Sequence, residues 1–339
     1  MTERPAEWRD MDKRDSEAAG EPEDGTLVRY PTLTYEVDGR VARLTFDRPE
    51  RGNAITADTP NDLAAAVERA DLDPRVRVIV LSGRGKGFCG GYDLVDSAER
   101  MLDGGLAGAD PHEGTVLAPG VQAANHDPSQ TWDPMIDYAM MSRFTKGFAS
   151  LLHANKPTVA KIHGFCIAGG TDIALHCDQI VIAADAKIGY PPTRVWGVPS
   201  AGLWAHRLGD QRAKRLLLTG DCLTGREAEA WGLAIEAPEP EQLDERVERL
   251  VQRIAAMPTN QLMMVKLALN SSLLAQGVHN SQMISTVFDG ISRHTREGYA
   301  FQQRAATAGF KTAVGERDAA PYDDFGSAGS HVTEGETDQ

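Results

Sequence analysis

The alternation of apolar and polar residues near the start of the chain predicts two short strands joined by a tight turn. Residues 33–37 and 41–46 carry apolar side chains at every second position, and Asp38-Gly39 lies between these two runs. A period of two places the apolar residues of a strand on one face. An Asp-Gly pair is a strong turn signal. The pattern therefore predicts a β-hairpin.

A helix with a marked start is expected next. Thr59 stands before a proline and Asp62 falls three residues later, which is typical of an N-cap followed by the first helical turn. Apolar residues then recur at helical spacing as far as Ala70. Residues 76–81 are almost wholly apolar and predict a buried strand that ends in the glycine-rich stretch 82–91.

A second unit of the same kind follows at residues 157–183. We expect a strand at 157–162, a turn at 164–170, the start of a helix at 171–176 and a strand at 179–183. Strands that alternate with helices indicate an α/β fold class with a layered core.

From residue 205 onward the pattern becomes helical. Residues 212–218, 228–233 and 243–257 carry apolar positions at helical spacing, and the last of these repeats them at Val247, Leu250, Val251 and Ile254. The sequence therefore divides into an α/β core at 27–205 and a C-terminal helical domain at 206–315.

Three segments do not fit either part. Residues 1–26 are polar and charged and predict a disordered arm, and residues 316–339 predict a flexible tail. Between the two α/β units lies a long insertion at about 98–140, rich in Gly, Pro and Asp, with an aromatic cluster around Trp132 and Tyr138. A loop of this length is usually functional or mobile.

Composition narrows the class of protein. The 339 residues are 41% hydrophobic, enough for a sizeable core, and 35 Lys and Arg against 49 Asp and Glu give a net charge of −14. This charge argues against nucleic acid or an anionic membrane surface as a partner. No apolar run approaches the roughly 20 residues of a membrane span, and no signal peptide is recognisable, so we expect a cytoplasmic protein. The four cysteines contain no Cys-x-x-Cys pair, which predicts reduced thiols and no zinc site.

Two glycine-bearing turns are the first candidates for chemistry. One spans residues 87–93 after a predicted strand, and the other spans residues 164–172 before a predicted helix. Two backbone N–H groups that face each other from such turns would form an oxyanion hole for a carbonyl oxygen. Each turn taken alone is better explained as an ordinary tight turn, because isolated Gly-Gly pairs are common in turns.

Together, five motifs resemble those of the crotonase (enoyl-CoA hydratase/isomerase) superfamily in order and spacing. The resemblance extends over roughly residues 30 to 270. The motifs lie at residues 48–54, 88–93, 168–178, 186–189 and 228–233.

The resemblance implies a spiral of ββα units with a C-terminal helical domain that joins subunits into a homotrimer or homohexamer. It also implies an acyl-CoA substrate, whose thioester carbonyl is held by the N–H groups of Gly90 and Gly169 while an enolate forms. No metal or cofactor is expected, because coenzyme A is part of the substrate. The substrate-binding residues carried over by position are Arg51, Asn53, Ala54, Phe88, Cys89, Asp93, Leu94, Tyr190, Thr193, Arg194 and Trp196.

The acid and base groups depart from the family pattern. Hydratases of this family use two glutamates; here the first position is Asp172, and the second segment, residues 189–197, contains no acid. Asp172 is therefore the expected acid/base group, with helix capping as its alternative explanation. The missing role is open to Tyr190, Thr193 or Arg194, and to Asp137 or Tyr138 from the long insertion.

Several nearby residues have simpler explanations. Arg194 cannot act as a base, but it could bind a substrate carboxylate or form a structural ion pair. Asp133 and Asp137 flank a predicted helix start, where capping is the commoner role. His163 and His176 lie in apolar stretches and are expected to be packing residues.

Two classes of function remain from the sequence. The first is an enzyme of the hydratase, isomerase or hydrolase type acting on a CoA thioester, with the long insertion favouring a bulky acyl group. The second is a non-catalytic acyl-CoA binding protein. The carboxylate at Asp172 favours the enzyme, because a binding protein has no use for a base beside the thioester.

Overall fold

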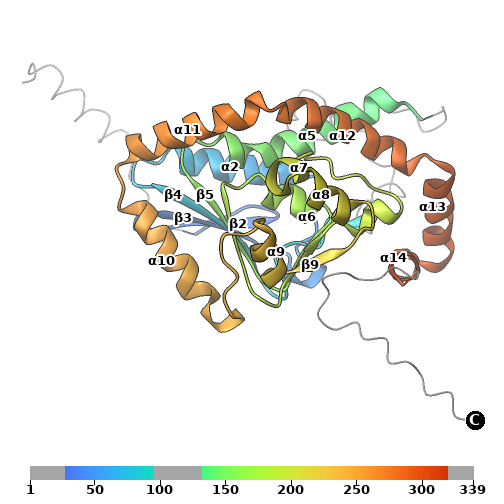
Figure 1. The fold of residues 1–339 in the computed structure, drawn as a ribbon, viewed down its shortest axis with the longest axis horizontal. Coiled ribbons are helices and arrows are strands. Elements are labelled where there is room, and N and C mark those ends of the chain that lie inside the picture. Colours follow the sequence, from blue (N-terminus) through green and yellow to red (C-terminus); the bar gives the residue numbers. More distant parts are fainter. Residues whose placement is uncertain (1–26, 95–131, 320–339) are drawn as a thin grey trace, which may run out of the picture.

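Two β-sheets organise the computed structural model, which describes residues 27–94 and 132–319 (Figure 1). The larger sheet has six strands in the order β1-β2-β3-β4-β5-β7. Its first three strands are antiparallel, and the rest pair in parallel. The strands are β1 (Val28–Arg29), β2 (Leu33–Asp38), β3 (Val41–Phe46), β4 (Val78–Gly83), β5 (Thr158–Ile162) and β7 (Gln179–Ile182).

The predicted hairpin is confirmed in its register. Leu33 pairs with Phe46 and Asp38 pairs with Val41, so the turn has two residues. Gly39 in that turn has φ 58°, a left-handed conformation that glycine adopts without steric cost. The two β-strands therefore form where the alternation of the sequence predicts them.

A second sheet of three short strands lies beside the first. Its strands, in the order β6-β8-β9, are β6 (Phe165–Ile167), β8 (Lys187–Gly189) and β9 (Cys222–Thr224). The turn predicted at residues 164–170 is wrong for the three residues of β6. A strand of three residues between glycines is too short to show a period, so its pairing with β8 was not visible in the sequence.

Two helices cover one side of the large sheet. These are α2 (Thr59–Leu72) and α5 (Pro134–His153), which pack against each other. The N-cap of α2 is Asp58 rather than Thr59, whose hydroxyl accepts the N–H of Thr56 instead.

The predicted insertion at 98–140 ends earlier than expected. Residues 134–140 form the first turns of α5, which the Asp133 carboxylate caps by accepting the N–H groups of Met135 and Ile136. The predicted capping role of Asp133 is thus confirmed. The rest of the insertion falls on residues 95–131, outside the described chain.

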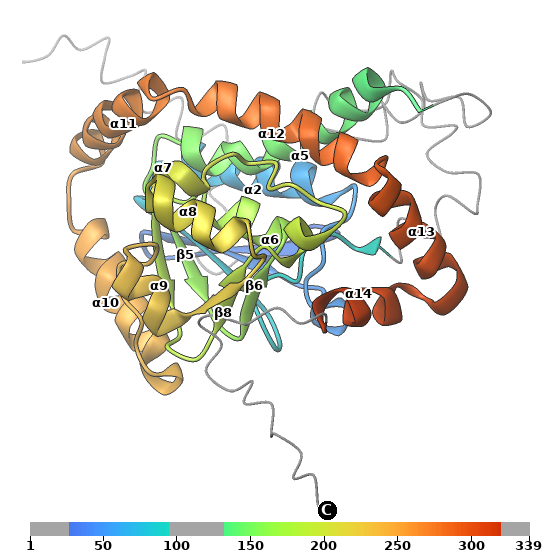
Figure 2. The same cartoon turned by 45° about the vertical axis from the view of Figure 1, so that its right-hand side comes forward.

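Helices dominate the chain after residue 203, as predicted. Helix α10 packs on the large sheet, α12 packs on α5, and α14 packs on η2. Helices α11 and α12 run across the top of the molecule, and α13 descends at one end (Figures 1 and 2). The helices are α7 (Trp204–Leu208), α8 (Asp210–Leu217), α9 (Gly225–Trp231), α10 (Leu243–Ala255), α11 (Thr259–Ala275), α12 (Val278–Arg293), α13 (Arg296–Ala308) and α14 (Phe310–Asp318), with 3-10 turns η1 (Pro49–Arg51), η2 (Pro191–Arg194) and η3 (Pro240–Gln242).

The ends of the described chain refine the predicted boundaries. Helix α14 reaches Asp318, so the first residues of the predicted tail at 316–339 are helical. The predicted arm at 1–26 and residues 320–339 lie outside the described chain. Within the described ranges, no helix has the length and apolar character needed to cross a bilayer.

Candidate active site

The two glycine turns predicted from the sequence lie against each other. The N–H of Phe88 donates to the carbonyl of Phe165 at 2.9 Å, and the N–H of Ile167 donates to the carbonyl of Cys89 at 2.9 Å. A Cβ atom on Gly170 would lie 2.6 Å from the Cys89 carbonyl oxygen, so this contact requires glycine. The two turns therefore form one unit at the start of α6 (Gly169–Ala174).

The N–H of Gly90 does not face this junction. It donates to the carbonyl oxygen of Gly52 at 2.9 Å, so this hydrogen bond holds the first glycine turn to the chain near residue 52. The prediction that Gly90 supplies an oxyanion donor is therefore wrong in this geometry, because a committed donor is not available to a ligand.

The neighbouring residue Tyr92 presents its N–H instead. Tyr92 forms an isolated parallel bridge with Ile55, in which Ile55 donates to the carbonyl of Gly91 at 2.8 Å and Asp93 donates to Ile55 at 2.9 Å. In such a bridge the N–H of the central residue points to the opposite side. A Cβ atom on Gly91 would lie 3.5 Å from the nitrogen of Gly169, so this segment lies next to the start of α6.

Gly169 is the first residue of α6, so the helix itself cannot satisfy its N–H. It follows Ala168, a non-glycine residue with φ 53°, which is a strained conformation of the kind found at functional sites. Gly169 and Tyr92 thus supply two N–H groups at one junction.

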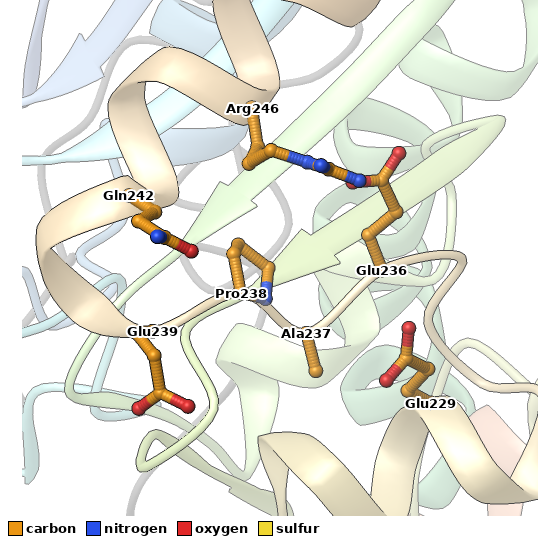
Figure 3. A pocket seen from close by; sticks show the side chains of 7 residues that line it. All are labelled: Glu229, Glu236, Ala237, Pro238, Glu239, Gln242 and Arg246. Carbon is orange, nitrogen blue, oxygen red and sulfur yellow. The ribbon is translucent and has the colours of Figure 1, made fainter.

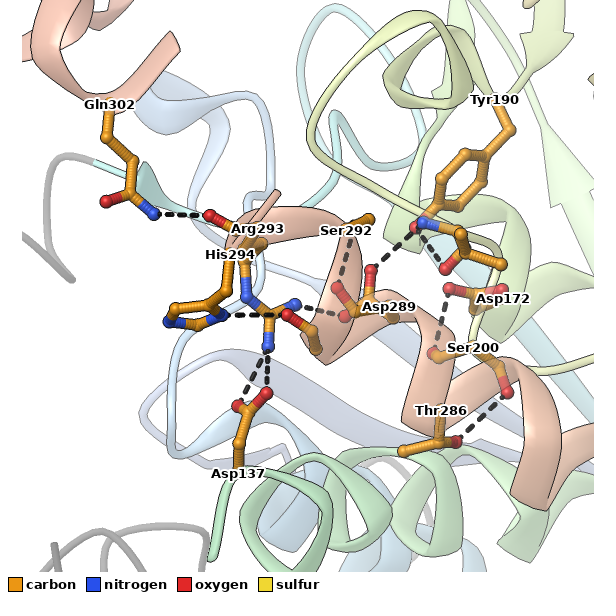
Figure 4. Close-up of polar contacts among 12 residues, drawn as sticks. Asp137, Asp172, Tyr190, Ser200, Thr286, Asp289, Ser292, Arg293, His294 and Gln302 are labelled. Carbon is orange, nitrogen blue, oxygen red and sulfur yellow. Dashed lines mark hydrogen bonds and ion pairs between the residues drawn. The ribbon is translucent and has the colours of Figure 1, made fainter. Parts of the chain in front are cut away.

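Asp172 lies one turn further along α6 and is 0% exposed. Its carboxylate accepts the N–H of Ala201 at 3.1 Å. It also accepts the hydroxyl of Ser200 at 3.2 Å (Figure 4). Burial raises the pKa of Asp172 to about 8, and the nearby charge of Asp289 raises it further, against the lowering effect of the hydrogen bonds. The group therefore changes protonation near neutral pH.

Helix α12 reaches this site with polar residues that the sequence analysis did not identify. Asp289 accepts the N–H of Val198 at 3.1 Å, and the Thr286 hydroxyl donates to the carbonyl of Ser200 at 3.4 Å. Helix α12 therefore holds the segment that supplies both hydrogen-bond donors of Asp172. Thr286 and Asp289 are three residues apart on α12, so they lie on one face of the helix, and this spacing was the available signal.

An ion-pair network continues from Asp289. Arg293 pairs with Asp289 and, through two hydrogen bonds of 2.8 and 2.9 Å, with Asp137 on α5 (Figure 4). Asp137 is therefore bound to a guanidinium group and is not a free base. The Asp289–Arg293–Asp137 network links α5 and α12.

The segment that lacks the expected glutamate folds as η2. The Tyr190 hydroxyl donates to the carbonyl of Val198 at 3.3 Å, and the Thr193 hydroxyl donates to the carbonyl of Tyr190 at 3.0 Å. Trp196, with φ 81°, packs on Phe301 and Phe310 at ring distances of 5.2 and 5.9 Å. The two hydroxyls and the indole ring thus contact neighbouring parts of the same chain.

Arg194 has a structural role. Its guanidinium lies 3.6 Å from Asp221 and 3.6 Å from Asp318, and its Nε donates to the carbonyl of Thr219 at 3.1 Å. Of the two roles left open for Arg194, the structural ion pair is the one observed.

Two other predicted substrate contacts also belong to the scaffold. The side-chain amide of Asn53 donates to the carbonyls of Arg84 and Gly87, both at 2.9 Å. Asp93 forms an ion pair with Arg48 at 2.9 Å, and Arg48 also donates to the carbonyl of Ala54. These contacts shape the first glycine turn.

Phe88 and Cys89 are both 0% exposed, which contradicts their predicted contact with substrate. The ring of Phe88 packs edge to face on Phe46 at 5.6 Å. Arg51 is exposed, and Leu94 is the last described residue before the gap at 95–131.

The predicted packing role of His176 is confirmed. Its Nδ1–H donates to the backbone carbonyl of Asp172 at 2.6 Å, and its Nε2 lies 2.9 Å from the side-chain amide of Gln282. Burial lowers the pKa of His176 to about 4, so the ring is neutral at physiological pH. His163 contacts the carbonyl of Gly85 at 2.8 Å.

A separate surface hollow lies between α9 and α10 (Figure 3). Its charged lining residues include Arg246 and Glu236, which pair at 2.7 Å. None of the residues at the glycine junction lines it.

Within 27–94 and 132–319, no three His, Cys, Asp or Glu side chains have the arrangement of a metal site.

Known proteins are similar to this chain in sequence and fold. The family described as enoyl-CoA hydratase/isomerase matches residues 36–110 and 130–306. A protein of Rhizobium meliloti named "Probable enoyl-CoA hydratase" is 30% identical over 257 residues, which cover 74% of this chain and 87% of that protein.

Solved structures agree with the sequence matches. The crystal structure of an enoyl-CoA hydratase from Mycobacterium smegmatis has 63% sequence identity and a TM-score of 0.78, covering 89% of this chain and 98% of that one. An enoyl-CoA hydratase/isomerase from Xanthobacter autotrophicus Py2 has 27% identity and a TM-score of 0.71, covering 86% of this chain and 98% of that one.

Proposed function

Since this chain belongs to the enoyl-CoA hydratase/isomerase family, we propose that it moves a proton at the α-carbon of a bound enoyl-CoA or acyl-CoA thioester. The observation that carries this proposal is the position of Asp172. A fully buried carboxyl group lies one helical turn from the N–H of Gly169, at the junction of the two glycine turns.

The N–H groups of Gly169 and Tyr92 are the proposed oxyanion hole. They would hold the thioester carbonyl oxygen and stabilise the negative charge that develops when an enolate forms. Tyr92 replaces Gly90 in this role, because the Gly90 N–H already donates to Gly52.

Asp172 is the proposed acid/base group. A pKa of about 8 leaves both protonation states accessible near neutral pH, as proton transfer in both directions requires. In hydration, the protonated carboxyl gives its proton to the α-carbon while the water oxygen bonds to the β-carbon. The carboxylate then takes one of the two protons of that water. This leaves a hydroxyl group on the β-carbon and restores the protonated form of Asp172.

The charges of the site favour an uncharged acyl group. Arg194 and Arg293 both pair with carboxylates, so neither offers an uncompensated positive charge to an acidic acyl chain. Asp172 and Asp289 would repel a substrate carboxylate. The size of the acyl group, which we expect to be bulky, depends on the insertion that lies outside the described chain.

Exchange at the α-carbon tests the proposal. A panel of enoyl-CoA and acyl-CoA thioesters is followed by NMR in heavy water with the wild type, Asp172→Asn and the control Asp185→Asn, whose side chain is exposed. Exchange should disappear in Asp172→Asn, while thioester binding measured by calorimetry persists. Unchanged exchange in Asp172→Asn would place the base elsewhere. Wild type that binds thioesters without exchanging or converting any would support the binding-protein alternative.

A homotrimer or homohexamer is the proposed assembly. Helices α11 and α12 expose large apolar side chains to solvent, among them Leu269 at 67% and Phe288 at 52%. A row of such residues on a soluble chain is typical of an interaction surface. A second copy of this chain is the proposed partner of this surface.

A further inference from the structure

The side chain of Tyr92 ends in a buried hydroxyl group whose hydrogen-bonding capacity is not fully used. Among the described residues, this hydroxyl has no hydrogen-bond partner. Buried polar groups are nearly always paired, so an unpaired one within a site indicates a missing ligand or water. We infer that the Tyr92 hydroxyl is a second catalytic group, which hydrogen-bonds to the oxygen at the acyl β-carbon; this inference rests on the proposed function.

The position of the ring supports this inference. A Cβ atom on Gly169 would lie 2.7 Å from Cε2 of Tyr92, so the ring lies directly on the proposed oxyanion residue. Phe144 on α5 fixes the ring from the side in an edge-to-face contact of 5.4 Å. The side chain is therefore held beside the first residue of α6, next to the N–H group proposed to bind the thioester oxygen.

The surroundings of the hydroxyl place it beside the acid/base group. It lies beside the Ser200 hydroxyl, which interacts with it weakly and donates its hydrogen bond to Asp172. The charged side chains of Asp172, Asp289 and Arg293 are also close enough to act on it electrostatically. Tyr190 lies in the same surroundings, but its hydroxyl already donates to the carbonyl of Val198. Tyr92 is thus the tyrosine of this cluster whose hydroxyl makes no hydrogen bond of normal geometry to a described residue.

The chemistry of the group defines its role. Burial raises the pKa of Tyr92 well above its usual range, so the phenol keeps its proton. It therefore acts as a donor and not as a base. Donation to the β-oxygen would orient the attacking water in hydration and stabilise the departing hydroxyl group in dehydration. In hydratases of this family a second glutamate is expected near this oxygen, but the corresponding segment here, residues 189–197, contains no acidic side chain.

Tyr92→Phe tests the inference with a matched control. The change keeps the ring and the backbone N–H and removes one oxygen atom. Tyr35 on β2 also has a buried hydroxyl without a partner among the described residues, so Tyr35→Phe controls for loss of such a group outside the site. Hydration of an enoyl-CoA should fall about 10²-fold in Tyr92→Phe and stay unchanged in Tyr35→Phe. Exchange of the α-proton by Asp172 should persist in both.

A binding measurement separates the inference from the overall reaction. Wild type should bind a 3-hydroxyacyl-CoA about tenfold more tightly than the corresponding saturated acyl-CoA, and Tyr92→Phe should lose this difference. Hydration and affinity ratios equal to those of Tyr35→Phe would overturn the inference. Wild type that exchanges α-protons but hydrates no enoyl-CoA would also overturn it, while the proposed function of Asp172 would stand.

Discussion

Asp172 combines complete burial with a nearby carboxylate, and this combination gives the site a pH dependence. Exchange of the α-proton requires the ionised carboxylate, whose pKa burial raises to about 8. The exchange rate should therefore rise about tenfold per pH unit below 8 and level off above it. Exchange rates between pH 5.5 and 9.5 measure this profile; a plateau that already begins near pH 5 would contradict it.

Arg194 shows how a residue on a functional motif can serve the fold. Arg194→Met keeps much of the side-chain volume but removes one of the two arginines that pair with the fully buried Asp221, and Arg215 is the other. The free energy of unfolding should fall by about 1–3 kcal/mol. Urea denaturation measures this loss, and the KM of a thioester should stay unchanged. A raised KM at unchanged stability would restore Arg194 as a substrate contact.

At the scale of elements, α5 and α12 are joined by one partly buried arginine. Arg293→Gln leaves Asp137 and Asp289 without their shared positive charge, and should lower the free energy of unfolding by about 3–5 kcal/mol. Adding Asp137→Asn removes one of the two repelling carboxylates and should restore part of that stability. Additive losses in the double variant would show that the three groups do not act as one network.

The same pair of helices meets at Gly290. A Cβ atom there would lie 2.1 Å from the Oδ2 atom of Asp137, so Gly290→Ala forces α12 away from α5 or breaks the pair with Arg293. Gly315 in α14 offers a control, because a Cβ atom added there meets nothing within 4 Å. Thermal melting should show a loss for Gly290→Ala, and a gain of up to about 1 kcal/mol for Gly315→Ala. Equal stability of the two variants would contradict this packing.

The sequence predicts those helices and strands that are long enough for their apolar residues to repeat at a recognisable spacing. Alternation from Leu33 to Phe46 predicts the hairpin, and apolar spacing predicts α10. Strand β6 has three residues and no readable period, so its pairing appears only in the fold.

The site residues also fall into those that the sequence predicts and those that only the fold brings together. Asp172 and Gly169 lie on a motif and could be predicted, whereas Asp289 and Thr286 reach Ser200 and its neighbours only because α12 packs there. The predicted substrate contacts of Phe88 and Cys89 are wrong because a motif gives the position of a residue but not the direction of its side chain. In the fold both point into the core.

For the whole molecule, assembly is the property most open to test. Sedimentation at micromolar concentration should give a trimer or hexamer. Leu269→Asp should shift it toward monomer, because the charge would have to be buried between copies. Leu72→Asp on α2, which is 73% exposed in the wild type, is the control and should leave the assembly intact. A wild-type monomer would remove α11 as an interface.

Because α12 supports the segment that bonds to Asp172, the site depends on a part of the chain that is synthesised late. Translation delivers the two glycine turns and Asp172 well before Thr286, Asp289 and Arg293 leave the ribosome. Until then, the segment from Val198 to Ala201 lacks its hydrogen bonds to α12, although it can already bond to Tyr190 and Asp172. We therefore expect the acid/base group of a nascent chain that has completed both sheets to become fully ordered when the C-terminal helices emerge.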